Sequence, residues 1–87
     1  MKDKFLIRMM TYEDDKEVMI KAFFSENITE LLNLYLVAKE NDISIDIPIE
    51  EEGHSKYDGQ EALVKEIRIS FGGHESITCL NIYVDVF

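Results

Sequence analysis

Apolar and polar residues alternate along two neighbouring segments near the start of the chain, 4–12 and 17–24. A period of two is typical of a β-strand that buries one of its faces. The polar residues Glu13 to Lys16 separate the two segments, and this length suits a four-residue hairpin loop, although the loop has no glycine for a positive φ. The pattern therefore predicts a hairpin. The buried face of its second strand is expected to carry Val18, Ile20, Ala22 and Phe24.

One helix is predicted between Asn27 and Asn41. Asn27 can cap its first turn, and Glu30 stands three residues later, as in a capping box. The apolar positions cover an arc of about 200°, which is wider than one sheet face usually requires. They are Ile28, Leu31, Leu32, Leu34, Tyr35, Leu36 and Ala38. Val37, on the polar side, is either an ordinary exposed residue or part of a contact surface.

Isoleucine at every second position from 43 to 49 predicts a half-buried strand. Pro48 lacks an N–H group, so this strand should be an edge strand or leave the sheet at that point. Two further alternating segments, 63–71 and 77–87, predict two more strands. Residues 51–60 lack an apolar pattern and are expected to form a mobile loop.

These elements predict an α+β fold in the order β-β-α-β-β-β, with a mostly antiparallel five-stranded sheet and one helix packed on one face. The length and the 46% hydrophobic content suit a single compact domain over residues 1–87. One helix leaves the other sheet face open. That face is expected to carry Leu6, Arg8, Met10, Tyr12, Met19, Lys21, Phe23, Cys79, Tyr83 and Phe87. Either a strand register is misassigned or the open face is an interface.

Eighteen acidic residues against nine basic ones give the chain a formal charge of −9. This charge repels nucleic acid and anionic lipid, so we expect neither direct nucleic-acid binding nor membrane binding, and we expect a cationic partner. The basic residues are dispersed, without a basic run. No continuous apolar segment indicates a leader or a membrane span, and the lone Cys79 cannot form an internal disulfide, so a cytoplasmic location is expected.

No motif indicates catalysis or a cofactor. The serines lack a nucleophile elbow, and nothing beside Cys79 in the sequence would activate it as a nucleophile. His54 and His74 each follow a glycine, and with a glutamate from 50–52 they could form a two-histidine, one-carboxylate metal site. Their spacing matches no metal motif. We therefore expect no metal, no cofactor and no enzymatic activity.

The acidic residues are unevenly distributed along the chain. They either serve solubility or form a negative surface that matches a basic groove, with carboxylates spaced like duplex phosphates at roughly 7 Å. We assign the partner-binding surface to the two densest groups. These are Glu50, Glu51, Glu52, Asp58 and Glu61, and Glu13, Asp14 and Asp15.

The sequence is thus typical of a small acidic, non-enzymatic protein-binding module. The most concrete interpretation is an inhibitor, a nucleic-acid mimic that occludes the basic nucleic-acid-binding surface of a larger protein such as a nuclease. Small acidic proteins without catalytic residues are typical of phage or mobile-element counter-defence of the anti-CRISPR or anti-restriction type. This narrower interpretation rests on that association alone. The alternative is a structural subunit that self-associates, for example as a homodimer, through the open sheet face.

Overall fold

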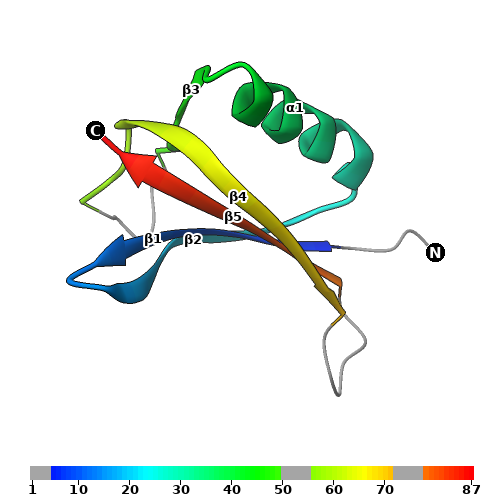
Figure 1. The fold of residues 1–87 in the computed structure, drawn as a ribbon. Coiled ribbons are helices and arrows are strands. Elements are labelled where there is room, and N and C mark those ends of the chain that lie inside the picture. Colours follow the sequence, from blue (N-terminus) through cyan, green and yellow to red (C-terminus); the bar gives the residue numbers. More distant parts are fainter. Residues whose placement is uncertain (1–4, 50–55, 72–77) are drawn as a thin grey trace.

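The computed structural model describes residues 5–49, 56–71 and 78–87 (Figure 1). Its elements are β1 (Phe5–Glu13), β2 (Lys16–Ser25), α1 (Ile28–Glu40), β3 (Ser44–Asp46), β4 (Glu61–Phe71) and β5 (Thr78–Val86). The five strands form one curled sheet in the order β2-β1-β5-β4-β3, and α1 lies on one side of it. The predicted α+β class and element order are confirmed. Within the described ranges, no helix is long and apolar enough to cross a membrane.

The sheet is mixed. The prediction of a mostly antiparallel sheet holds for β1–β2, β3–β4 and β4–β5, but β1 and β5 are parallel. The amino-terminal hairpin and the β3–β4–β5 unit therefore join along the centre of the sheet. Alternation along a strand specifies which side chains share a face and leaves open which strand lies beside it, so the pattern could not reveal this pairing.

A β-bulge in β2 corrects the predicted faces of that strand. Met9 pairs with Lys21 and Met10 pairs with Met19, so Ile20 is an extra residue in β2. Ile20 and Lys21 are both buried, and beyond the bulge Phe23 packs against the core while Phe24 is exposed. The predictions of Ala22 and Phe24 on the buried face and of Lys21 and Phe23 on the open face are therefore wrong, because the extra residue reverses the alternation.

A second bulge lies in β4. Val64 pairs with Val84 and Glu66 pairs with Tyr83, which leaves Lys65 as the extra residue. Val64 and Ile67 consequently both belong to the core face although they are three positions apart. The predicted uninterrupted alternation from residue 63 to residue 71 is thus broken in its middle.

The core lies between α1 and the covered face of the sheet (Figure 1). Its buried members are Ile7, Met9, Ile20, Tyr35, Ala38, Ile47, Ala62, Val64, Leu80, Ile82 and Val84. The helix contributes Tyr35 and Ala38, with Ile28, Leu31 and Leu32 partly buried against them. Leu34, Leu36 and Val37 are exposed. The apolar stripe in use is therefore narrower than the predicted arc, since one sheet face accommodates only side chains at i, i+3, i+4 and i+7 spacing.

The helix begins and ends where predicted, but the hydrogen bonds at its two ends differ from the predicted ones. Asn27 occupies the N-cap position, but its side chain makes no capping hydrogen bond, so the predicted capping box is wrong. Its backbone N–H donates instead to Ser25 Oγ at 3.1 Å. At the other end Asp42 takes a left-handed φ of 53°, and the Ile43 N–H donates to the Ala38 carbonyl at 3.0 Å. This is a Schellman motif in which aspartate takes the usual place of glycine.

The strand predicted over 43–49 shortens to Ser44–Asp46 and is an edge strand that leaves the sheet before Pro48, as expected. Ile47 follows it and is buried, whereas Ile43 and Ile49 are exposed. The Ile47 N–H donates to the Gln60 carbonyl, and the Ile47 carbonyl accepts from the Gly59 N–H, each at 2.9 Å. Of the predicted mobile loop, residues 56–60 are thus a turn held by hydrogen bonds, and residues 51–55 lie outside the described ranges.

Candidate functional site

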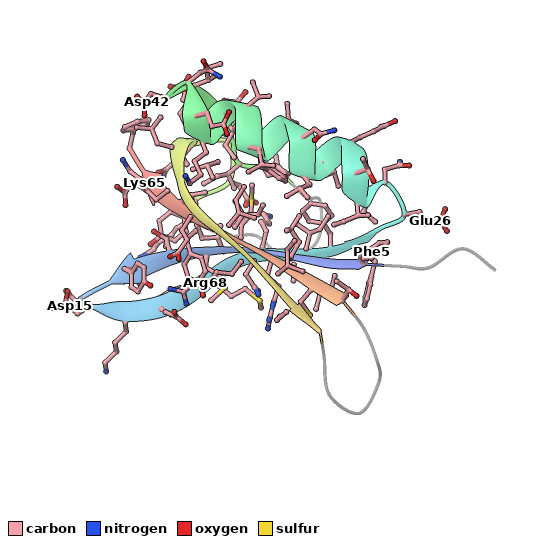
Figure 2. All side chains as sticks on the ribbon, turned by 45° about the vertical axis from the view of Figure 1, so that its right-hand side comes forward. Phe5, Asp15, Glu26, Asp42, Lys65 and Arg68 are labelled. Carbon is pink, nitrogen blue, oxygen red and sulfur yellow. The ribbon has the colours of Figure 1, made fainter. Side chains whose placement is uncertain are left out.

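The sheet topology gathers carboxylates at one end of the molecule. Because β1 and β5 are parallel and β4 is antiparallel to β5, the ends of β1 and β5 lie near the start of β4. Strand pairing and the ion pairs of the 56–59 turn place seven carboxylates at this acidic end, namely Glu13, Asp14, Asp15, Asp46, Asp58, Glu61 and Asp85. Figure 2 shows Asp15 at this end, with Phe5 and Glu26 at the opposite end. Both predicted acidic groups therefore contribute to one region of the surface.

Asp14 and Asp15 form the tip of the β1–β2 hairpin. Glu13 pairs with Lys16, so the loop contains two residues rather than the predicted four. Asp14 and Asp15 have φ values of 51° and 64°, and positive values at both positions are the requirement of a type I′ turn. Aspartate adopts a positive φ more readily than most residues other than glycine. The turn holds two adjacent exposed carboxylates at the tip of a rigid hairpin.

Two ion pairs connect the 56–59 turn to the hairpin. Lys56 Nζ lies 2.6 Å from Glu13 Oε1, on the surface. Lys21 Nζ lies 2.6 Å from Asp58 Oδ1, with side chains only 3% and 11% exposed. Glu13 and Asp58, both assigned above to partner binding, are thus occupied by cations of the same chain. The buried pair was not foreseen, because the bulge that turns Lys21 inward leaves no mark in the apolar pattern.

The remaining predicted residues divide into two groups. Glu61 is exposed and stands opposite Asp46 across β3 and β4, an arrangement of like charges that weakens a sheet slightly and concentrates negative charge. Glu50, Glu51 and Glu52 lie outside the described residues, as do His54 and His74 of the candidate metal site. Within residues 5–49, 56–71 and 78–87, no group of three or more histidine, cysteine or acidic residues could hold a metal ion.

The open face of the sheet, opposite α1, carries four rows of side chains that run across β2, β1, β5 and β4. In that strand order they are the apolar row (Phe24, Leu6, Cys79, Ser70), the arginine row (Ala22, Arg8, Asn81, Arg68), the methionine row (Met19, Met10, Tyr83, Glu66) and the carboxylate row (Glu17, Tyr12, Asp85, Leu63). The carboxylate row is nearest to the acidic end. Continuing the β1–β5 register beyond Met10 places Tyr12 beside Asp85.

Hydrogen bonds tie the arginine row together. Arg8 Nε donates to Asn81 Oδ1 at 2.8 Å, and Asn81 Nδ2 donates to Ser70 Oγ at 3.3 Å. Arg68 donates to both carboxylate oxygens of Glu66 at 3.1 Å, which raises the pKa of the guanidinium. These contacts hold both arginines of the chain on the open face.

Two stacked tyrosines join the methionine and carboxylate rows. The rings of Tyr12 and Tyr83 are 6.0 Å apart, and both hydroxyls donate to Glu17 Oε1, at 3.4 and 3.3 Å. Partial burial and the Glu17 carboxylate raise the pKa of Tyr12. The Arg68 guanidinium lies 4.9 Å from the centre of the Tyr83 ring. Tyrosine and arginine held in fixed positions are the residue types that dominate binding energy at protein interfaces.

The open face is nearly neutral. Its four rows contain two arginines and three carboxylates, a formal charge of +2 − 3 = −1, and one of these carboxylates, Asp85, also belongs to the acidic end. The molecule therefore presents a strongly negative end and a nearly neutral face with aromatic and apolar side chains. Comparisons with protein-family models, with curated proteins and with solved structures find no match for this chain. Its function must be argued from these two surfaces.

Proposed function

We propose that this protein is a small, non-enzymatic protein-binding module that occupies a basic, nucleic-acid-binding surface of a larger protein. The observation that carries this proposal is the collection of carboxylates from several separate segments at one end of the sheet. A net charge of −9 adds long-range attraction toward a cationic surface. Such attraction chiefly accelerates association and selects against acidic partners.

The rigid placement of the acidic end supports competition with nucleic acid. Asp14 and Asp15 are fixed by their turn, and Asp46 and Glu61 by strand pairing. Carboxylates held in this way lose little conformational entropy on binding, as do the regularly spaced phosphates of a duplex. Inhibition of a nuclease in phage counter-defence, of the anti-CRISPR or anti-restriction type, is the narrower form of this proposal, and it rests on association with other small acidic proteins.

A matched pair of variants tests the proposal. Asp14→Asn with Asp15→Asn neutralises the hairpin tip and keeps residues that tolerate a positive φ. Glu26→Gln with Glu30→Gln removes the same charge near the start of α1, away from the acidic end, and leaves both proteins at −9 + 2 = −7. The immobilised parent and both variants are used to capture proteins from a nuclease-treated bacterial extract. Captured proteins are then purified and titrated in the presence of duplex DNA.

We expect a captured DNA-binding protein to be displaced from duplex DNA by the parent. The tip variant should associate several-fold more slowly and with a weaker salt dependence, whereas the control variant should behave like the parent. Equal effects of the two variants would place the contact elsewhere. A partner that binds DNA and this protein at the same time would contradict the occlusion mechanism.

A further inference from the structure

Both edges of the sheet are protected against pairing with another strand. The β2 edge contains the bulge at Ile20 and the inward-pointing Lys21, and the β3 edge is three residues long and is followed by Pro48. Bulges, inward charges, short strands and proline are the devices by which soluble proteins prevent edge-to-edge association. The open face has no such protection. Association with another chain is therefore expected to use the face rather than the edges.

The β2 and β1 half of the open face, called here the apolar half, exposes the larger apolar side chains, although it also carries Arg8 and Glu17. Phe24, Met19 and Tyr12 are 59%, 54% and 53% exposed, and all three lie on β2 or β1. The β5 and β4 half, called here the polar half, carries Asn81, Arg68 and Glu66. We propose that this face binds a second copy of the chain face to face, with β2 over β2 of the copy and with the rows in reversed order.

Symmetry limits an aligned face-to-face dimer to two arrangements. The twofold axis lies in the interface and runs either across the strands or along them. An axis across the strands keeps β2 over β2 and reverses the rows, so the apolar halves of the two copies meet. An axis along the strands places β2 over β4, so each apolar half would cover a polar half. Burial of apolar surface favours the first arrangement.

The charges favour the same arrangement. With the rows reversed, the arginine row of one copy faces the methionine row of the other, and Arg68 faces Glu66 twice across the twofold axis. An axis along the strands would place the arginine row over itself and the carboxylate row over itself. Because the strand order is reversed, Arg68 would then face Ala22, and Glu66 in the methionine row would face Met19. Neither charge would meet an opposite charge across the interface, so the second arrangement is disfavoured.

The position of the acidic end is a third, independent argument. It lies beyond the carboxylate row, so reversing the rows sends the acidic ends of the two copies to opposite ends of the dimer. The alternative axis would stack the two acidic ends on each other. Four strands about 4.8 Å apart and four rows about 6.8 Å apart give roughly 500 Å² per copy and 1,000 Å² for the pair. That is about the lower limit for a specific interface, and it predicts a dimer that forms at micromolar or higher concentration.

Sedimentation equilibrium from about 1 μM to 1 mM tests the dimer, with face variants matched to controls of similar exposure on α1. Phe24→Glu is matched with Leu34→Glu, and Met19→Glu with Val37→Glu, at 57% and 51% exposure for the two helix residues. We expect the parent to change from 10.1 kDa to twice that mass as concentration rises. Each face variant should weaken the dimer about tenfold or more, because each is repeated across the twofold axis. The helix variants should dimerise like the parent.

The charge pairing has its own test. Arg68→Glu should weaken the dimer, and adding Glu66→Arg should restore it, because the exchange recreates the pairing both within and between copies. A parent that remains at 10.1 kDa throughout would overturn the proposal, even if another protein is found on this face. So would face variants that dimerise like their controls.

The dimer is independent of the proposed function, and salt separates the two. Two copies of charge −9 repel each other, so added salt should strengthen the dimer. Added salt should weaken the binding of a cationic protein, because that binding depends on charge attraction. Loss of one behaviour with retention of the other would show which proposal has failed.

Discussion

The buried pair Lys21–Asp58 provides the sharpest test of the packing described here. Asp58→Asn keeps the size of the side chain and removes the carboxylate that lies 2.6 Å from the Lys21 ammonium. Lys21 then keeps its charge without this carboxylate, on a side chain that is only 3% exposed. Removing one partner of a buried pair costs about 3–5 kcal/mol, out of about 4–13 kcal/mol of total stability for a domain of this length. We expect the melting temperature to fall by at least about 12 °C.

The other corners of a double-mutant cycle make this prediction specific. Lys21→Met should destabilise less than Asp58→Asn, because the remaining Asp58 carboxylate is nearer to solvent. Lys21→Met combined with Asp58→Asn removes both charges and should be more stable than Asp58→Asn alone. Asp85→Asn is the control, since Lys65 and Asp85 are 3.8 Å apart and more than half exposed, and its loss should cost less than about 1 kcal/mol.

Thermal and urea unfolding, followed by circular dichroism, measure all four proteins and the control. The packing argument would be refuted if Asp58→Asn melted within about 3 °C of the parent. It would also be refuted if the effects of the two single substitutions simply added in the double variant, because additivity is the behaviour of sites that do not interact.

Two further predictions concern α1. Leu32→Ala should cost about 2 kcal/mol or more because Leu32 packs against the core, whereas Leu34→Ala at an exposed position should stay within about 0.5 kcal/mol; equal losses in urea unfolding would contradict the assigned helix face. Burial raises the pKa of Tyr35 above its usual value of 10.0. The stability linked to the neutral hydroxyl is therefore complete below pH 10 and declines as the pH rises through the folded-state pKa. Tyr35→Phe should remove that part of the alkaline decline in melting temperature, and an unchanged decline would show that other groups cause it.

The order of elements was predictable because each carries a strong local pattern. Alternation marked the hairpin, helical spacing marked α1, and Pro48 marked an edge strand. The face assignments failed where a bulge adds one residue, at Ile20 and at Lys65. A bulge costs little locally and is stabilised by tertiary contacts, so it leaves no signal in a single sequence.

The candidate site was only partly predictable, for a related reason. Charge density along the sequence indicated Asp14, Asp15 and Glu61, which the structure places at one end of the sheet. It also indicated Asp58, whose partner Lys21 is 37 positions away, since 58 − 21 = 37, and faces it only because of the bulge. The placement of both acidic groups at the same end of the sheet depends on the parallel β1–β5 pairing, which local patterns do not specify.

The parallel β1–β5 pairing also governs how this chain must fold. Arg8 in β1 bonds to Asn81 in β5 across 73 positions, so closing this seam brings distant parts of the chain together at a large cost in chain entropy. The β1–β2 hairpin is local in sequence, and so is the unit formed by α1, β3, β4 and β5. The core contains residues from both, so neither part alone buries its apolar side chains completely. Folding is therefore expected to be slower than that of a helical protein of equal length and to have its main barrier at the closing of the seam. Until β5 pairs with β1, the hairpin cannot pack against the rest of the sheet, so we expect it to be unstable before that step.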